Sequence, residues 1–345
     1  MKIGYHFWGF LGPGVADTSD DGRSHRAVLV DALARAGHEV VLLQMHRDLV
    51  QARDDLGGAY TFDVGFPDID GLVLEWRRPV PGRNTSPCGR PGHSCDLHRQ
   101  QELLARYTVP GVPTVVWDRD LWLPADDAVR ALPNVTVAES ALRPRAGASR
   151  LFFPVAEEVL DAADPEELVR RARPLPLLLV GDEDERGDGF DRYFAPAAAR
   201  WPHRVVGRWD AAGHRSGLDF AGRLPFAHIA ALYDRALSAL LLATPWHDAA
   251  GHVSPRLPEA VLAGCLPMTP AARHDAETLT PAALHARDGA EVARILEDLV
   301  RIAGTPDHVL LLADCLKRLD LFRARDQVAA IEAMLSRAVC GMGAG

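Results

Sequence analysis

An arginine and a glutamate one helical turn apart offer the chemistry of a nucleotide site. Arg256 and Glu259 lie just after Ser254, a plausible helix N-cap, and before Gly264, a typical helix stop. A diphosphate needs cations and free N–H groups, whereas a ribose needs a carboxylate that accepts its hydroxyls. The spacing therefore predicts a short helix that binds a nucleotide. The alternative is that Glu259 caps the helix dipole and Arg256 is a solvated surface residue.

A longer pattern around this pair resembles a known family. Arg-x-x-Glu-Ala-x-x-Ala-Gly-x-x-Pro, from Arg256 to Pro267, is similar to the donor-binding segment of GT-B glycosyltransferases, near family 4 and the spore-maturation-type relatives. The resemblance implies that Glu259 holds the ribose of a nucleotide sugar, and we place His252 in the same donor-binding set. Many family 4 enzymes carry a second glutamate eight residues earlier, where this sequence has Gly251.

A second cation is expected after the first strand of the C-terminal half. Leu177–Val180 is an apolar run, followed by an acidic turn and Arg186. Ligands bind beyond the carboxyl ends of strands in open α/β sheets, so Arg186 and Arg256 are predicted to neutralise a departing diphosphate. Alternatively, Arg186 pairs with its acidic neighbours. Arg223 ends another predicted strand, and the resemblance places it beside the nucleotide base.

The N-terminal half offers a glycine loop and a carboxylate. Gly12 and Gly14 follow the first predicted strand, where the chain could approach the donor phosphate and sugar closely. Asp118 follows an apolar strand and is the candidate general base if the reaction inverts configuration. With Arg186 and Arg256 it completes the predicted catalytic set. The alternative for Asp118 is a loop cap or an ion pair with Arg119.

One polar loop carries thiols and imidazoles that could bind zinc. Its residues are Cys88, His93, Cys95 and His98, and their spacing does not match a familiar zinc knuckle. We therefore expect an acceptor-side loop without bound metal, and a zinc site is the alternative. The sequence has no Gly-x-Ser-x-Gly elbow, which argues against a serine hydrolase.

Composition limits the class of protein. The 345 residues are 48% hydrophobic and 25% charged, as in a globular protein long enough for two domains. A net charge of −9 argues against nucleic-acid binding over the whole surface. No run approaches the roughly 20 apolar residues of a membrane span, and no signal peptide is evident. Five cysteines, an odd number, suggest reduced thiols and hence a cytoplasmic protein.

Strands and helices alternate along the chain. A βαβ unit is expected from a strand at Lys2–Phe7, a helix at Ser24–Ala36 and a strand at His38–Gln44. The second of these strands lacks the terminal acid of a nicotinamide site. Further strands are predicted at residues 71–76, 113–117, 135–138, 151–154, 177–181, 204–207, 219–222, 239–242 and 266–269. Further helices are predicted near residues 96–107, 226–236, 255–263, 289–303 and 310–340.

This order predicts an α/β protein of the GT-B type, with two Rossmann-like domains facing a central cleft. We expect an N-terminal acceptor domain at residues 1–160, a nucleotide-sugar donor domain at 172–310, and a helical tail at 311–345 that packs back on the N-terminal domain. A linker with a helix inside it is expected between the two domains.

The resemblance implies a metal-independent glycosyltransferase that needs no cofactor beyond its co-substrate, a nucleotide-diphosphate sugar such as a UDP-sugar. The acceptor hydroxyl would belong to a natural product, a glycan or a modified nucleobase, so nucleic acid enters only as an acceptor. Two alternatives are a GT-B-fold sugar-nucleotide epimerase and a non-catalytic sugar-nucleotide-binding protein. The glycine at position 251 favours the second alternative.

Overall fold

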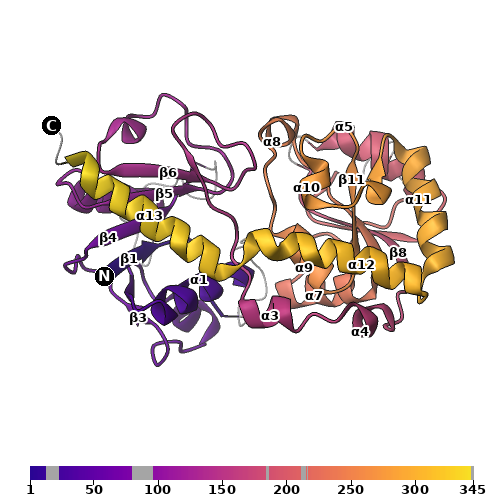
Figure 1. Ribbon diagram of the computed structural model, residues 1–345, viewed down its shortest axis with the longest axis horizontal. Helices are drawn as coiled ribbons and strands as arrows, with labels where there is room; N and C mark the ends of the chain where they lie inside the picture. Colours follow the sequence, from indigo (N-terminus) through magenta and orange to yellow (C-terminus); the bar gives the residue numbers. More distant parts are fainter. Residues whose placement is uncertain (13–22, 80–95, 184–185, 211–214, 216, 343–345) are drawn as a thin grey trace. The chain divides into compact units, whose positions relative to one another are not determined.

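The computed structural model describes residues 1–12, 23–79, 96–183, 186–210, 215 and 217–342. These residues belong to two compact units, which Figure 1 shows with the chain coloured from its N-terminus to its C-terminus. The first unit is assembled from parts of Met1–Gly14, His25–Pro154 and Ala324–Gly345, and the second is built on Val155–Arg323.

The first unit contains a seven-stranded parallel sheet in the order β3-β2-β1-β4-β5-β6-β7. After β3 the chain returns to the other side of β1, so the topological switch point lies between β1 and β4. The strands are β1 Lys2–His6, β2 Glu39–Leu42, β3 Thr61–Phe62, β4 Gly71–Glu75, β5 Thr114–Asp118, β6 Val135–Glu139 and β7 Ser149–Arg150.

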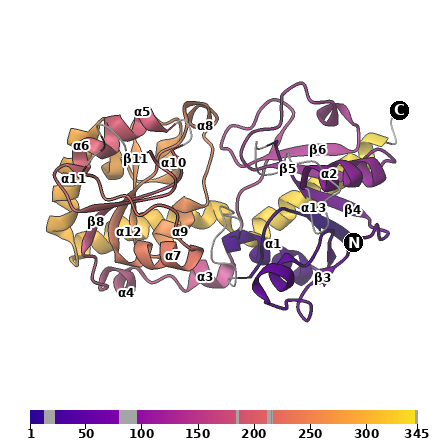
Figure 2. The ribbon, with the colours of Figure 1, turned by 180° about the vertical axis from the view of Figure 1, so that it is seen from behind.

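Helices cover both faces of this sheet, which is why its central strands are apolar along their length. Leu33 of α1 and Leu335 of α13 pack with Ile3 on one face, and Leu103 of α2 packs with Leu72 on the other. Figures 1 and 2, which view the molecule from opposite sides, show α13 and α2 on opposite faces. The elements are α1 Arg23–Arg35, η1 Asp48–Ala52, α2 Asp96–Leu103, η2 Leu104–Thr108, η3 Ala128–Ala131 and α13 Ala324–Met342.

The second unit contains a five-stranded parallel sheet in the order β12-β11-β10-β8-β9. Its switch point lies between β8 and β10 by the same argument. The strands are β8 Leu175–Val180, β9 His203–Val206, β10 Ala236–Leu240, β11 Leu266–Pro270 and β12 His285–Ala286.

The helices of the second unit also cover both faces of their sheet. Tyr233 of α7 and Ala260 of α9 pack with Leu178 of β8, while α11 contacts β8 and β10 from the other face (Figures 1 and 2). The elements are α3 Glu157–Asp161, α4 Pro165–Val169, α5 Gly187–Gly189, η4 Phe190–Phe194, α6 Ala195–Ala198, α7 Phe226–Arg235, α8 Pro245–Ala250, α9 Arg256–Leu262, α10 Ala276–Leu279, η6 Ala282–Leu284, α11 Gly289–Ile302, α12 Pro306–Arg318 and η7 Leu319–Phe322.

Two of the strands expected from the sequence were wrong. Leu151–Pro154 does not form a strand, because Phe152 N–H donates to the side chain of Gln327 at 2.8 Å and Pro154 cannot donate at all. Asp219–Gly222 makes only one isolated bridge, between Phe220 and Val205. The single helix expected at residues 310–340 was also wrong, because η7 and Arg323 separate α12 from α13. The other expected strands and helices form with shifts at their ends.

In the second unit, one arginine donates hydrogen bonds to backbone carbonyls at the C-terminal ends of two helices. Arg173 Nη1 donates to the carbonyl of Ala236 at 2.9 Å, and Nη2 donates to the carbonyl of Ala263 at 2.7 Å. Carbonyls at helix C-termini lack partners within their helix, and the partly buried guanidinium of Arg173 satisfies them. This contact holds the C-terminal end of α9, the helix that carries Arg256 and Glu259.

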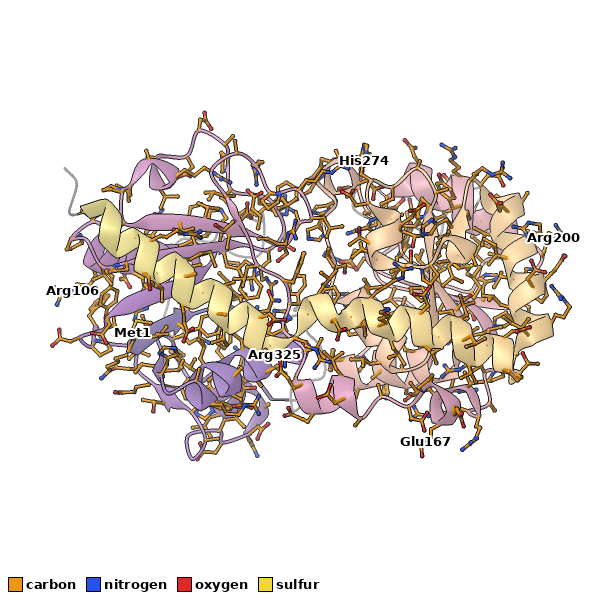
Figure 3. The ribbon with its side chains drawn as sticks, in the orientation of Figure 1. Met1, Arg106, Glu167, Arg200, His274 and Arg325 are labelled. Carbon is orange, nitrogen blue, oxygen red and sulfur yellow. The ribbon has the colours of Figure 1, made fainter. Side chains whose placement is uncertain are left out.

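Side chains fill the space around each sheet, and the labelled Arg106 and Arg200 of Figure 3 lie on the outer surface of their own units. Among the helices of the described residues, none has the length and apolar character that would let it cross a membrane.

A glycine next to the first strand of the second unit allows a close backbone approach. Gly207 has φ +136°, and a Cβ there would lie 2.1 Å from the carbonyl oxygen of Gly181. We expect Gly207→Ala to lower the melting temperature by about 6 °C, because the backbone at this position must shift to make room for the Cβ. A strained backbone costs up to about 3 kcal/mol, and each kcal/mol shifts a domain of this size by roughly 2 °C. Thermal unfolding followed by circular dichroism measures the change.

Gly222→Ala is the matched control. Gly222 also has a positive φ, +67°, but a Cβ there meets no atom within 4 Å. Its substitution should therefore cost only the left-handed conformation, about 1–2 kcal/mol. An equal loss in both variants would show that the close approach to Gly181 does not matter.

Candidate functional site

The arginine–glutamate pair lies at the beginning of α9, close to where the sequence predicts it. Arg256 Nη1 and Glu259 Oε2 are 2.7 Å apart, and their side chains are 18% and 13% exposed. The helix begins one residue later than expected, with Pro255 as the N-cap, and Ser254 Oγ accepts the N–H of Arg256 at 3.3 Å. Both side chains are therefore oriented by each other and still reach solvent.

The loop before α9 is held by stacked rings. The imidazoles of His247 and His252 stack with their centroids 4.1 Å apart, and the centroids of Trp246 and His247 are 3.5 Å apart. His252 N–H donates to the carbonyl of His247 at 2.9 Å. His252 is only 8% exposed. Its ring therefore packs inside the loop that leads to Arg256 and is largely shielded from solvent.

Sequence reasoning missed an ionic contact behind this loop. Arg273, which follows β11, is buried and donates to the carbonyl of His252. Its Nε lies 3.9 Å from Asp248 Oδ1. Burial lowers the pKa of Arg273 and raises the pKa of Asp248. The neighbouring residue, His274, is exposed (Figure 3). Arg273 and His274 are adjacent polar residues after the same strand, so the sequence does not show which of the two is buried.

Arg186 lies at the carboxyl end of β8 and is only partly buried. Its Nη1 donates to the carbonyl of Asp182 at 2.9 Å. The carboxylate of Asp182 pairs instead with Arg208 at 2.8 Å, and Glu183 pairs with Arg215. These two acidic side chains are therefore bound by other arginines, and the other two acidic neighbours, Asp184 and Glu185, lie outside the described residues.

The second unit brings four of the predicted donor residues to one edge of its sheet. Arg186 follows β8, while His252, Arg256 and Glu259 follow β10, and these two strands are neighbours on either side of the switch point. Crevices at switch points are where ligands bind in such sheets. Arg223 is exposed and lies beyond β9, on the other side of β8, so the structure does not bring it to the same place.

The backbone N–H groups of the glycine loop in the first unit bind a carboxylate of the same unit. The N–H groups of Leu11 and Gly12 donate to Asp48, at 3.2 and 2.8 Å. A Cβ on Gly12 would lie 2.4 Å from Asp54 Oδ2, which explains the glycine without a ligand. Gly14 lies outside the described residues.

Asp118 ends β5 as predicted, but its side chain is only 1% exposed. Its Oδ1 accepts the N–H of Trp122 at 2.8 Å, and its Oδ2 accepts the N–H of Leu123 at 2.8 Å. Arg145 Nη2 donates to Oδ2 at 2.9 Å. Asp118 therefore caps the loop after β5, the alternative considered above, with Arg145 as its partner in place of Arg119.

A second carboxylate at the same edge, Glu75, is enclosed by cations. Arg26 donates to both of its oxygens at 2.9 and 2.8 Å, Arg119 Nη1 lies 3.3 Å from Oε2, and Tyr5 Oη donates to Oε1 at 2.6 Å. Burial alone would raise the pKa of Glu75, but the guanidinium groups of Arg119 and Arg26 hold it well below its ordinary value. The sequence shows the glutamate but not these partners, which come from other elements.

The cysteine–histidine loop falls mostly outside the described residues, which include neither Cys88, His93 nor Cys95. His98 lies in α2, with Nε2 at 3.5 Å from Glu102 Oε1. Within the part of the chain that the structure describes, no three His, Cys, Asp or Glu residues are grouped to hold a metal ion.

Comparison with known proteins gives matches among solved structures alone, since no family model and no curated protein matches the sequence. The T4 phage β-glucosyltransferase aligns over 97% of this chain and 99% of its own, with 12% identity and a TM-score of 0.61. A glycosyltransferase involved in avilamycin A biosynthesis aligns over 99% and 98%, with 16% identity and a TM-score of 0.56. Sucrose-phosphate synthase from Thermosynechococcus elongatus aligns over 98% and 99%, with 13% identity and a TM-score of 0.54.

The chain has the GT-B fold. The predicted fold class is confirmed, because these GT-B proteins match both parallel sheets over nearly the whole chain. The finer resemblance to family 4 and the spore-maturation-type enzymes stays a prediction, as do the roles of the individual residues.

Asp118 should titrate close to neutral pH. Burial raises its pKa to about 6, although the N–H groups of Leu123 and Trp122 and the charge of Arg145 partly oppose the shift. Because the folded pKa exceeds the ordinary value of 3.8, the contribution of Asp118 to stability is full below pH 3.8 and is lost as the pH rises through 6. Carbon-13 NMR of the labelled carboxyl group should show a midpoint near pH 6, and Arg145→Gln should move it higher. A midpoint at or below pH 4 would contradict the burial argument.

Proposed function

We propose that this chain is a glycosyltransferase that moves a sugar from a nucleotide-diphosphate sugar to an acceptor hydroxyl. The observation that carries the proposal is the Arg256–Glu259 pair at the switch-point edge of the second sheet. Support comes from the GT-B neighbours, since the T4 phage enzyme was solved with UDP-glucose and an Anabaena protein with UDP. A UDP-sugar is therefore the first donor to test.

In the second unit, Glu259 accepts hydrogen bonds from the two ribose hydroxyls, and Arg256 moves from the carboxylate to the diphosphate. A carboxylate that already has a charged partner at 2.7 Å is held in place before the ligand arrives. Arg186, on the neighbouring strand, supplies the second cation. Arg186 and the relocated Arg256 then stabilise the negative charge that develops on the leaving diphosphate.

In the first unit, Asp118 acts through the loop that it caps. Asp120 belongs to that loop and is partly exposed. In an inverting reaction the acceptor oxygen bonds to the anomeric carbon as the bond from that carbon to the diphosphate oxygen breaks. The acceptor proton passes to Asp120, and the electron pair leaves with the diphosphate.

The proposed enzyme uses no cofactor other than its sugar nucleotide and needs no metal, because Arg186 and Arg256 provide the counter-charge. Transfer that stops in EDTA and resumes with a divalent cation would contradict this part of the proposal. A cytoplasmic location fits the thiols, since Cys265 and Cys315 are unpaired and buried.

Nucleotide binding should stabilise the folded protein. At a concentration 100 times its Kd, a nucleotide adds about 2.7 kcal/mol to the free energy of unfolding, enough to raise the melting temperature by several degrees. We expect UDP or another nucleoside diphosphate to produce such a shift, measured by differential scanning fluorimetry. Glu259→Gln should abolish most of it, because the amide no longer accepts both ribose hydroxyls and loses its charged partner.

The matched control is Glu166→Gln, which removes a carboxylate paired with Arg170 at 3.3 Å on the exposed surface. It should leave the shift unchanged. No stabilisation by any nucleoside diphosphate would contradict the proposal. A shift without sugar transfer to any acceptor would favour a non-catalytic binder, and interconversion of sugar nucleotides would favour an epimerase.

A further inference from the structure

Two tryptophans flank the carboxyl end of β4 in the first unit. Trp8 follows β1 and Trp122 follows β5, and both of these strands pair with β4. The residues that follow β4 contact both tryptophans, since Arg77 donates to the carbonyl of Trp8 and Arg78 Cζ lies 3.3 Å from the ring centroid of Trp122. The two tryptophans therefore follow the strands on either side of β4, Trp8 on the side of the switch point between β1 and β4 and Trp122 on the side of β5.

Each indole is held by a guanidinium group. Arg47 Cζ lies 3.2 Å from the ring centroid of Trp8, and Arg47 itself is buried. Gln100, from α2, fixes the backbone between the rings, because it accepts the N–H of Arg77 at 2.8 Å and donates to its carbonyl at 3.2 Å. A cation stacked on an indole orients the ring, so both rings are positioned before any ligand binds.

These rings do not serve the hydrophobic core. Trp117, on β5, is fully buried among core residues, whereas Trp8 and Trp122 are partly exposed and belong to no core cluster of the described residues. A partly exposed aromatic ring that is already oriented can stack on a planar ligand at the carboxyl edge of the sheet. We call Trp8 and Trp122, with Arg47, Arg77 and Arg78, the indole platform.

We propose that the indole platform binds an acceptor that is a small planar aromatic compound with a phenolic hydroxyl. This inference rests on the proposed function and names its acceptor class. Asp120 precedes Trp122 by two residues in the same loop, which suits removal of a phenolic proton. A net charge of −9 argues against nucleic-acid binding over the whole surface, so we take a small aromatic acceptor as the ligand to test.

Binding of 2-naphthol to the full chain tests the proposal without a donor or turnover. Equilibrium dialysis should give a Kd for 2-naphthol at least tenfold lower than for its saturated analogue, decahydro-2-naphthol, which has no flat face. Trp8→Ala and Trp122→Ala should each weaken 2-naphthol binding about 5- to 100-fold, the loss of one stacking contact. Trp8→Phe and Trp122→Phe keep a flat ring and should retain most of the affinity.

Two controls separate this inference from the proposed function. Trp201→Ala removes a partly exposed indole of the second unit and should not change 2-naphthol binding. UDP should still stabilise the Trp8 and Trp122 variants, which shows that they fold and that the donor site is intact.

Three results would overturn the inference while UDP stabilisation persists. The first is no binding of 2-naphthol, and the second is equal binding of 2-naphthol and its saturated analogue. The third is equal binding by the wild-type chain and the alanine variants. A single-stranded oligonucleotide that binds through Trp8 and Trp122 where 2-naphthol does not would replace the small phenol with a nucleic acid. Loss of UDP stabilisation in the wild-type chain would instead refute the proposed function.

Discussion

The first unit depends on one buried carboxylate. Glu75 is surrounded by Arg26, Arg119 and Tyr5, which bring α1, β5 and β1 against the end of β4. Its side chain and that of Arg26 are at most 1% exposed. Removing one partner of a buried ion pair costs about 3–5 kcal/mol, because the remaining charge is left uncompensated.

That cluster also decides where the neighbouring side chains lie. Trp8 comes two residues after β1, Arg77 comes two residues after Glu75, and Trp122 belongs to the loop that begins beyond Arg119. The buried cluster thus fixes the three strand ends from which the indole platform projects. In the second unit, Arg173 has the corresponding role for α9, because it binds the carbonyls at the helix C-terminus. Arginines thus hold the carboxyl ends of strands together in the first unit through Glu75, and in the second unit they bind helix-end carbonyls.

Most of the fold could be predicted from the sequence, because buried parallel strands are continuous apolar runs and the helices between them show helical spacing. One predicted strand failed because a side chain replaced a backbone partner. Phe152 lies in an apolar run, yet its N–H is bound by Gln327, which lies 175 residues away. No local pattern reports such a contact. The short strands β3, β7 and β12 were missed because two residues give no measurable period.

The candidate site was predictable to the extent that its residues are adjacent in sequence. Arg256 and Glu259 form their pair within one helical turn, so their spacing was sufficient. Glu75 lies within the strand predicted at residues 71–76, but its arginine partners come from other elements, so their contacts with it could not be predicted from the local sequence. For Asp118, the sequence suggested a general base because the carboxylate ends a strand. In the structure its two oxygens accept the N–H groups of Trp122 and Leu123, so it caps the loop.

The central claim is that the switch-point edge of the second sheet holds a nucleoside diphosphate. A crystal structure of the protein with UDP tests it most directly. The account predicts the ribose hydroxyls on Glu259 and the diphosphate between Arg256 and Arg186, with the Arg256–Glu259 contact opened. UDP bound at any other place, with that contact intact, would contradict it.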